Sequence, residues 1–460
     1  MRIIDLNKTR EIGSQCMYLE IGNFKILLDC GMSPREEGFK ALPDFALING
    51  EAIDFIVISH CHLDHVGSLP FFMKNQQQAR VLTSPASHII MPRILENSVT
   101  IMTMQREERG IKEYPLYSVG DIKELDQHIL PMPHAKMRTL QKDGSEINIT
   151  FFLAGHVIGA SSVLIEYKHR TLFFSGDVLF RNQKTLKGAL WPKKTVDVVI
   201  SETTRGNHSQ RDGFSYQSEI DRLINRIKYT LEGGGSVLIP AFALGRMQEI
   251  LKILHNAQTQ KKLPKNVPIF CSGLGLGLVD DFEVANKKLR CIDFGSAILR
   301  DLKVKSFRNA KFDKLRKPTK QSIFVLSSGM LVENTPSYLT AANLVGDPQN
   351  AILFVGYCDP MTPGGELLAQ EKHSSFDFKA LRFSTKIEAY IERFDLSGHA
   401  DREDLLECIF SLNPRTVILT HGEKESRDWF FDNIIDKRPK IIIIDPEPGE
   451  WYDIKNRTTI

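Results

Sequence analysis

The sequence is poor in cysteine and contains no C-x-x-C pair. Its seven cysteines are an odd number and lie far apart, which indicates neither a disulfide framework nor a thiolate zinc site and favours a reducing compartment. No apolar run approaches the ~20 residues of a membrane span, and the first ten residues, MRIIDLNKTR, lack the apolar core of a signal peptide. We therefore expect a soluble, cytoplasmic protein without a membrane partner.

The sequence also lacks an excess of charge of either sign. Lys and Arg number 59 against 56 Asp and Glu, so overall basicity does not favour a nucleic-acid partner, and any site for a polyanion must be local. At 460 residues the chain is too long for one ordinary core, which predicts two or more domains.

Residues 54–69, DFIVISHCHLDHVGSL, form a dense cluster of metal-binding residue types. The apolar run Phe55–Ile58 has the length of a buried strand, and four polar residues follow it: His60, His62, Asp64 and His65. Imidazole nitrogens and carboxylate oxygens suit zinc and similar divalent ions, and their burial without a cation would be costly. Four ligands in one turn cannot all reach one ion without strain. The spacing therefore indicates two metal ions, with an exposed polar loop as the alternative.

Other apolar runs also end in an acidic residue or a histidine. His156 follows INITFFLAG, Asp177 follows RTLFFSG, and Glu202 follows VDVVIS. Each run alone fits an ordinary polar strand end, but together they predict a sheet that presents a site at one edge. Asp29 closes the expected strand Phe24–Leu28. It fits either a turn residue or a carboxylate that orients a metal-bound histidine.

Between these motifs the pattern predicts a helix over residues 86–109. Residues 110–145 read as irregular and polar, with His128 and His134 as ordinary surface histidines.

After Gly206, strands alternate with helices, which predicts a parallel α/β unit of about 180 residues. The loops after its strands, at Ser272, Ser328–Gly329 and Thr362–Gly365, carry the glycines and hydroxyls that let backbone N–H groups approach a phosphate. Each loop alone fits an ordinary turn. With Arg246 at a helix start, the three loops together predict phosphate or RNA contacts.

Residues 301–320 form a basic segment. They carry eight Lys and Arg against two Asp, so 8 minus 2 leaves +6. The segment fits a solvated surface. It also fits a groove for a nucleic-acid backbone, with Phe307 and Phe312 between the charges.

The final seventy residues return to the opening pattern. His399 lies in FDLSGHAD, and His421 follows RTVILT. Residues of metal-binding types therefore occur near both ends of the chain, with a different unit between them. This arrangement predicts one domain in two parts, residues 1–205 and 386–460, with an inserted domain over residues 206–385.

HCHLDH at 60–65, with His156, Asp177, Glu202, His399 and His421 in this order and an insertion before SGHAD, resembles the metallo-β-lactamase superfamily and, within it, the β-CASP ribonucleases. The resemblance covers nearly the whole chain. It implies an α/β fold, an αββα sandwich with an inserted β-CASP domain of parallel strands. The pattern is similar to the endonuclease subunit of the cleavage and polyadenylation machinery in its short prokaryotic form.

The resemblance implies two Zn²⁺ per chain. It assigns His60, His62 and His156 to one ion, Asp64, His65 and His421 to the other, and Asp177 to both. A hydroxide between the ions is the implied nucleophile. His399 is the implied general acid and Glu202 its orienting partner, Asp64 also counts as catalytic, and Asp29 would act from behind the ligands.

The implied substrate is single-stranded RNA, cut to leave 5′-phosphate and 3′-hydroxyl ends, because members that cut DNA carry a small apolar residue in place of His421. The sequence departs from the family pattern at one place. Family members commonly carry a GTxGR-like stretch after the Gly-Tyr turn, whereas here Gly356–Tyr357 is followed by CDPMTPGGEL, without the arginine. The residues that would bind the phosphate backbone at this turn therefore stay open. The alternatives are a DNA nuclease, a lactam or thioester hydrolase, and a non-catalytic RNA-binding protein. The sequence does not decide between internal cutting and 5′–3′ exonuclease action. It also leaves open which RNA is recognised and whether the protein forms a homodimer.

Overall fold

The computed structural model describes residues 1–209, 213–312, 318 and 320–454. They group into two compact units. Unit 1 comprises Met1–Asn182, Lys187–Gln210 and His399–Ile460, and unit 2 comprises Gln183–Leu186 and Arg211–Gly398.

Unit 1 contains two seven-stranded sheets. The order of the first is β22 (Trp451–Asp453), β1 (Arg2–Asp5), β2 (Met17–Ile21), β3 (Phe24–Leu28), β4 (Phe55–Val57), β5 (Arg80–Thr83) and β6 (Ile129–Pro131). The order of the second is β21 (Ile442–Ile444), β20 (Thr416–Thr420), β11 (Val198–Glu202), β10 (Arg170–Phe174), β9 (Ser161–Tyr167), β8 (Ser145–Leu153) and β7 (Met137–Lys142). Buried apolar residues of both sheets, among them Leu28, Phe151 and Ile200, form one core, so the sheets pack face to face.

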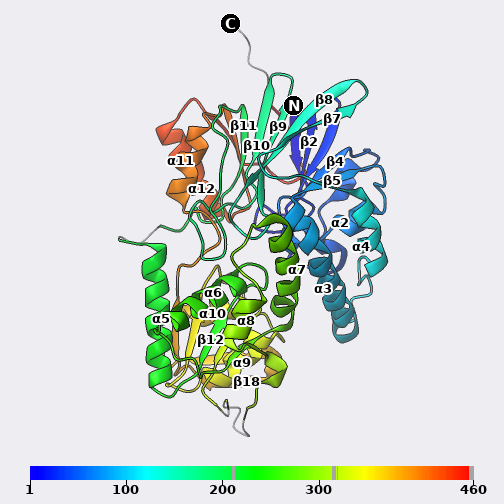
Figure 1. Cartoon of the computed structure of the whole chain (residues 1–460). Coiled ribbons are helices and arrows are strands. Elements are labelled where there is room, and N and C mark those ends of the chain that lie inside the picture. Colours follow the sequence, from blue (N-terminus) through cyan, green and yellow to red (C-terminus); the bar gives the residue numbers. More distant parts are fainter. Residues whose placement is uncertain (210–212, 313–317, 319, 455–460) are drawn as a thin grey trace. The chain divides into compact units, whose positions relative to one another are not determined.

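Helices cover the outer faces of this pair of sheets. On the second sheet, Phe173 and Leu419 pack against α11 (Arg402–Ser411) and α12 (Lys424–Lys437). α2 (Leu69–Met73), α3 (Pro85–Arg109) and α4 (Val119–Leu125) lie beside β4 to β6 (Figure 1). The layers therefore run helix, sheet, sheet, helix, which confirms the predicted αββα sandwich.

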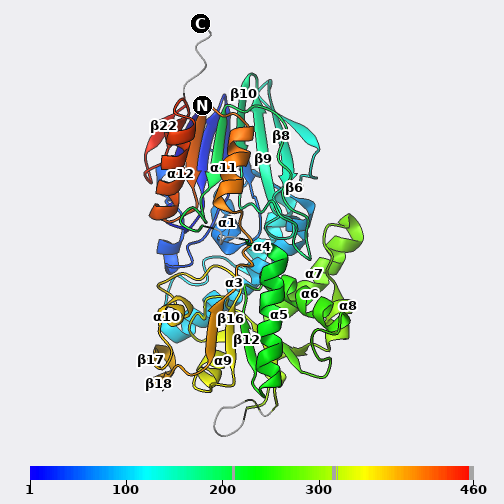
Figure 2. The same cartoon turned by 90° about the vertical axis from the view of Figure 1, so that its left-hand side faces the viewer.

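Unit 2 is built on a parallel sheet of six strands. Their order is β14 (Lys305–Ser306), β13 (Ile269–Cys271), β15 (Ile323–Leu326), β12 (Val237–Pro240), β16 (Ala351–Phe354) and β19 (Tyr390–Arg393). The helices are α5 (Tyr216–Glu232), α6 (Arg246–Thr259), α7 (Gly273–Leu289), α8 (Ser296–Leu302), α9 (Pro336–Leu344) and α10 (Pro363–Ala369), and a hairpin pairs β17 (Ser375–Phe378) with β18 (Phe383–Lys386) (Figure 2). The predicted alternation of strands and helices is confirmed.

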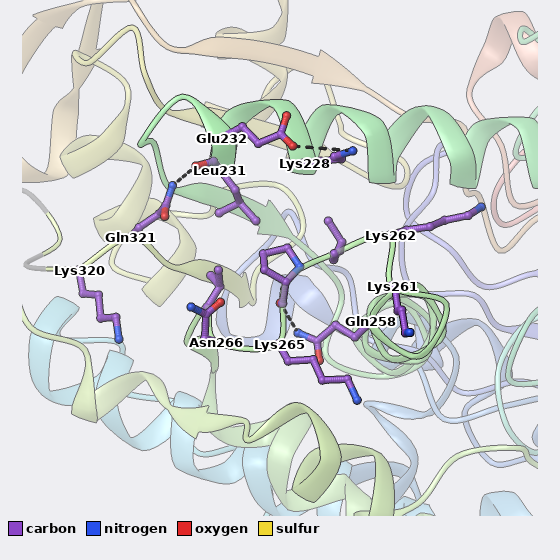
Figure 3. Close-up of a pocket in the computed structure, with 13 residues that line it drawn as sticks. Lys228, Leu231, Glu232, Gln258, Lys261, Lys262, Lys265, Asn266, Lys320 and Gln321 are labelled. Atoms are coloured by element: carbon purple, nitrogen blue, oxygen red, sulfur yellow. Dashed lines mark hydrogen bonds and ion pairs between the residues drawn. The ribbon is translucent and has the colours of Figure 1, made fainter.

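The helix ends of unit 2 follow the local sequence. Ser215 and Ser218 form a capping box at the start of α5, and Gly233 ends that helix. The ends of α5 and α6, with the residues that precede β13 and β15, line a pocket of about 720 Å³ (Figure 3).

The interpretation of residues 110–145 as irregular is wrong. This stretch contains α4, β6 and all of β7. Ser118 and Asp121 form a capping box that starts α4, and β6 and β7 exist because they pair with β5 and β8. A polar edge strand is stabilised by its neighbour rather than by its own pattern, so the sequence carries little trace of it.

None of the helices in the described part of the chain is both long and apolar enough to cross a membrane.

We expect Phe151→Ala to lower the free energy of unfolding of unit 1 by about 3–5 kcal/mol, because Phe151 is fully buried in the core between the sheets. Urea denaturation followed by tryptophan emission measures this, since Trp191, Trp429 and Trp451 all lie in unit 1. The control Met137→Ala, at an exposed position of β7, should change stability by less than about 0.5 kcal/mol. Equal effects of the two substitutions would contradict the core assignment.

Candidate metal centre

The polar strand ends of unit 1 meet because their strands run in the same direction. β10, β11 and β20 pair in parallel, and β8 is antiparallel to β9, which is antiparallel to β10. The carboxyl ends of β8, β10, β11 and β20 therefore lie at one edge of the second sheet. That edge carries His156, Asp177, Glu202 and His421. In the first sheet, the parallel strands β3 and β4 end near Asp29 and His60.

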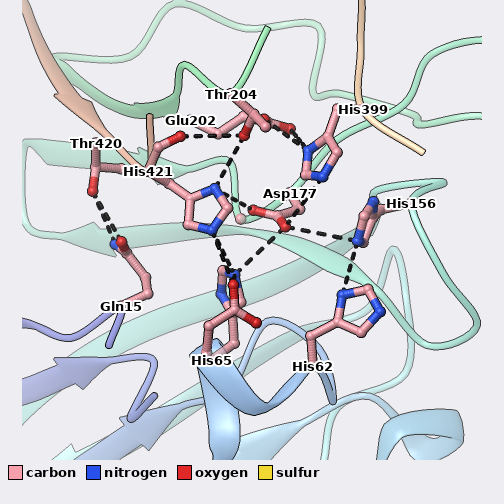
Figure 4. A network of polar contacts seen from close by, with 12 residues as sticks. Gln15, His62, His65, His156, Asp177, Glu202, Thr204, His399, Thr420 and His421 are labelled. Atoms are coloured by element: carbon pink, nitrogen blue, oxygen red, sulfur yellow. Dashed lines mark hydrogen bonds and ion pairs between the residues drawn. The ribbon is translucent and has the colours of Figure 1, made fainter. Parts of the chain in front are cut away.

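Three imidazole rings of unit 1 bring their nitrogens together, and Figure 4 shows two of them, those of His62 and His156. His62 Nδ1 lies 3.0 Å from His60 Nε2 and 3.1 Å from His156 Nε2. Asp177 Oδ2 lies 3.7 Å from both His60 Nε2 and His156 Nε2. The structure thus brings together the first of the two donor sets expected from the sequence.

The second set lies on the other side of Asp177. His421 Nε2 is 3.3 Å from both His65 Nε2 and Asp64 Oδ2. Asp177 Oδ2 is 3.5 Å from His65 Nε2, and Asp177 Oδ1 is 3.4 Å from His421 Nδ1. The Asp177 carboxylate therefore lies between the two sets and contacts both.

The donor chemistry of both sets fits divalent cations. The far ring nitrogen of His65 lies 2.7 Å from Asp29 Oδ2, and that of His60 lies 3.1 Å from Ser59 Oγ. If those nitrogens carry the ring protons, lone pairs on the inner nitrogens face the cluster. Asp177 Oδ1 is buried and has no hydrogen-bond partner among the described residues. A cation would satisfy these converging donors, and the clusters with the superfamily match below support a metal cofactor.

The electrostatics of the cluster are strongly coupled. Burial lowers the pKa of His60 well below its usual value, and the charge of His65 adds to this. Burial alone would also lower the pKa of His65, but the surrounding carboxylates, led by Asp177, raise it well above its usual value. Burial favours the neutral form of Asp177, yet the neighbouring histidines, led by His421, hold its pKa well below the usual value. A buried carboxylate kept ionised in this way is suited to hold a cation.

His399 and Glu202 form a separate pair beside the two donor sets. His399 Nδ1 lies 3.0 Å from Glu202 Oε2, and His399 Nε2 lies 4.0 Å from Asp177 Oδ2. The other carboxylate oxygen of Glu202 accepts a 2.6 Å hydrogen bond from the backbone of Val178. Glu202 is therefore fixed in place and orients the His399 ring with Nε2 toward the cluster.

Asp29 lies behind the ligands, as expected from the sequence. Besides contacting His65, it accepts hydrogen bonds from the backbone N–H and the hydroxyl of Ser59, at 2.7 and 2.8 Å. Gly31 packs so tightly here that a Cβ would stand 1.7 Å from the Asp64 carbonyl oxygen. Only glycine fits this approach, which fixes the turn of residues 60–65 against β3.

Two residues of the site were missed in the sequence. Ser59 lies between Asp29 and His60, and Thr204 Oγ1 lies 3.1 Å from His421 Nδ1. Both residues lie within two positions of a motif residue. This closeness to a motif residue was the only signal in the sequence. It is a weak signal, because hydroxyl side chains are common at strand ends for other reasons.

The residues expected to contact phosphate all lie in unit 2. Arg246 is buried, and its guanidinium donates to the Leu396 carbonyl oxygen and to Gln183 Oε1. It therefore braces the protein interior and is not placed to grip a phosphate, which corrects the expectation. Ser272 Oγ bonds the hydroxyl and backbone of Ser327, and Ser328 Oγ accepts from Val332 N. These contacts make Ser272 and Ser328 turn residues, and Gly329 packs against Phe242.

Of the two alternatives for residues 301–320, the nucleic-acid groove was supported by Phe307 and Phe312 between the charges, and the structure does not bear out that support. Both pack against the core of unit 2, and Phe312 stacks on Phe324 with ring centroids 5.9 Å apart. Of the eight basic residues of this segment, Lys314, Arg316 and Lys317 lie outside the described residues.

His134 is not an ordinary surface histidine. Its Nε2 lies 2.9 Å from Ser161 Oγ, and burial lowers its pKa to about 4. No neighbouring residue indicates this environment, because His134 becomes half-buried only when the chain packs near β9.

Comparisons with known proteins match three segments of the chain. Residues 9–232 match the metallo-beta-lactamase superfamily, residues 247–367 match the Beta-Casp domain, and residues 384–445 match the Zn-dependent metallo-hydrolase RNA specificity domain.

Several curated proteins are similar over nearly the whole chain. The "Integrator complex subunit 11 homolog" of Dictyostelium discoideum is 30% identical and covers 95% of this chain. "Endoribonuclease ysh1" of Schizosaccharomyces pombe is 30% identical over 92%, and "Probable RNase MJ4" of Methanocaldococcus jannaschii is 27% identical over 98%. The chain spans 59% and 54% of the two eukaryotic relatives and 99% of the archaeal one.

One solved structure, a protein of unknown function from Enterococcus faecalis V583, matches 98% of this chain and 99% of its own with a TM-score of 0.55 and 14% identity. It supports the fold alone.

We expect His134→Gln to reduce the acid sensitivity of the protein. A histidine with a pKa of about 4 in the folded state and about 6.5 in the unfolded state makes the unfolded state bind more protons. Stability should therefore fall as the pH drops from about 6.5 to 4, by up to about 3 kcal/mol, and then level off. Urea denaturation at several pH values measures this loss, which the variant should lack and the control His128→Gln should retain. Parallel curves for the parent and His134→Gln would contradict the assignment.

Proposed function

We propose that this chain, which belongs to the metallo-beta-lactamase superfamily and carries a Beta-Casp domain, is a metal-dependent ribonuclease that hydrolyses phosphodiester bonds of single-stranded RNA in RNA processing or decay. The observation that carries the proposal is the arrangement of His399 with Glu202 beside two cation-binding donor sets that share Asp177. The match to an RNA specificity domain and the similarity to proteins named endoribonuclease and RNase support RNA as the substrate.

In this proposal the metal ions are two zinc ions. His60, His62 and His156 would hold one ion, Asp64, His65 and His421 would hold the other, and Asp177 would contact both. When bound there, such ions would supply a water molecule of lowered pKa and would offset negative charge on the phosphate. We also propose that residues 1–205 and 386–460 form the two parts of one domain and that residues 206–385 form a domain inserted between them.

The protein's own residues supply orientation and a proton. Asp29 holds the His65 ring at Nδ1, so that Nε2 stays directed at the cluster. Glu202, fixed by Val178, holds the His399 ring at Nδ1. His399 Nε2 then carries the proton that passes to the leaving 3′ oxygen as the P–O bond breaks. The products carry a 5′-phosphate and a 3′-hydroxyl.

Circular and linear RNA of the same sequence test the mode of cutting. Internal hydrolysis opens the circle, whereas an enzyme that requires a 5′ end leaves it intact. Single-stranded DNA and a panel of lactams and thioesters serve as competing substrates. Turnover of the panel without turnover of RNA would refute the proposal.

We expect His399→Ala to lower RNA turnover by ~100-fold or more, the usual contribution of a general acid, while metal content stays at the parental value. Metal analysis of the purified variant and a turnover assay check both parts. Unchanged turnover would show that His399 is not the proton donor.

Asp177→Ala should lose metal and activity together, because Asp177 contacts both donor sets. About two zinc ions per chain in the parent and a clear deficit in the variant would agree with the two-ion proposal. A parental protein that binds no zinc would refute it. His128→Gln, at a residue that belongs to none of the donor groups, is the control for both measurements.

A further inference from the structure

The pocket of Figure 3 lies at the edge of the unit 2 sheet where the strands begin. It is bounded by the end of α5, by residues 258–267 between α6 and β13, and by Lys320 and Gln321 before β15. None of the residues discussed for the metal centre lines it. Its volume of about 720 Å³ is that of a ligand site rather than of a surface irregularity.

The pocket is strongly basic. Five lysines and one glutamate line it: Lys228, Lys261, Lys262, Lys265, Lys320 and Glu232. The lining charge is 5 minus 1, or +4, and the ion pair of Lys262 with Asp221 reduces it to +3. The ends of two helices contribute roughly −0.5 each. About two positive charges therefore stay uncompensated in a concave surface, which attracts polyanions.

Three of the lysines are available for a ligand. Lys261, Lys265 and Lys320 are exposed, and within the described residues their ammonium groups form no ion pair. Figure 3 shows them spaced around the pocket. Ammonium groups on flexible stems contact successive phosphates of a strand without demanding one geometry.

The remaining lining favours a nucleic-acid strand over a small metabolite. Leu231 and Leu263, both buried, give the pocket an apolar floor with Pro264 and Val267. The amides of Gln258 and Gln321 donate to the carbonyl oxygens of Pro264 and Leu231, so these side chains fix the walls and are not free to read a ligand. A pocket with an apolar floor, no aromatic side chain in its lining and lysines at its rim would contact a strand through its phosphates and without regard to sequence.

We propose that this lysine pocket is a second, sequence-independent binding site for the single-stranded RNA substrate, separate from the metal centre. The proposal rests on the proposed ribonuclease function. It predicts that the pocket lysines contribute to the binding of a long RNA, whereas a short RNA held at the metal centre alone does not depend on them.

The test combines three charge-neutralising substitutions, Lys261→Gln, Lys265→Gln and Lys320→Gln, in the full chain. The matched control is Lys287→Gln, Lys372→Gln and Lys386→Gln, which removes the same charge from exposed positions of unit 2 outside the pocket. Fluorescence anisotropy measures binding of a 30-nucleotide RNA across a salt series, in a His399→Ala background that slows cutting. Turnover of the 30- and 8-nucleotide RNAs is measured with His399 present.

The pocket variant should bind the long RNA roughly 100-fold more weakly at about 0.1 M salt, and the slope of log K against log salt should become shallower by about 2, for three lost phosphate contacts. Turnover of the short RNA should not change, and the control should behave as the parent. If circular dichroism shows that the triple variant does not fold, each single substitution should still reduce the slope by about 0.7.

Pocket and control variants with equal affinity and slope would overturn the inference while leaving the ribonuclease proposal intact. Loss of binding to an acidic polypeptide, with RNA binding unchanged, would overturn it in favour of a protein partner. A parental protein that neither binds nor cuts RNA would refute both the ribonuclease function and this inference.

Discussion

The buried carboxylate of Asp177 is the contact on which the rest of unit 1 depends. It lies within 3.7 Å of ring nitrogens from both donor sets, and these histidines come from the turn after β4, from the residues after β8 and from the end of β20. So many polar groups are stable together only where attraction between unlike charges offsets the cost of removing them from water. The two sheets are therefore joined by attraction between unlike charges at this edge as well as by the apolar core between them.

Most of this site could be predicted because it follows a local rule. Each donor comes directly after an apolar strand, and parallel strands bring their carboxyl ends to one edge, so His156, Asp177 and His421 were recognisable from their neighbours in the sequence. The resemblance of the motif order to a known family supplied the division into two donor sets. For Asp29 the local pattern left a turn residue and a histidine-orienting carboxylate as alternatives, and only the resemblance favoured the second.

The failures concern residues whose environment is set by distant parts of the chain. Arg246 looked available, but its partners are Gln183 and Leu396. Phe312 sits among lysines in sequence and against Phe324 in space. Nothing near His134 in the sequence indicates its burial. The charge and hydrophobicity of a residue indicate which contacts it is able to make. Packing against distant parts of the chain determines which of those contacts it makes in the folded protein.

The position of β20 has a consequence for how the protein is made. This strand pairs with β11 on one side and β21 on the other, yet it is synthesised after all of unit 2. In a nascent chain that has not yet reached residue 416, β11 pairs with β10 alone and its other edge is open. Such a chain also lacks His421, so its second donor set is incomplete. Because domains form as their parts emerge, the two donor sets of unit 1 can be complete only after all of unit 2 has been synthesised, and a chain truncated within unit 2 would lack a complete second set.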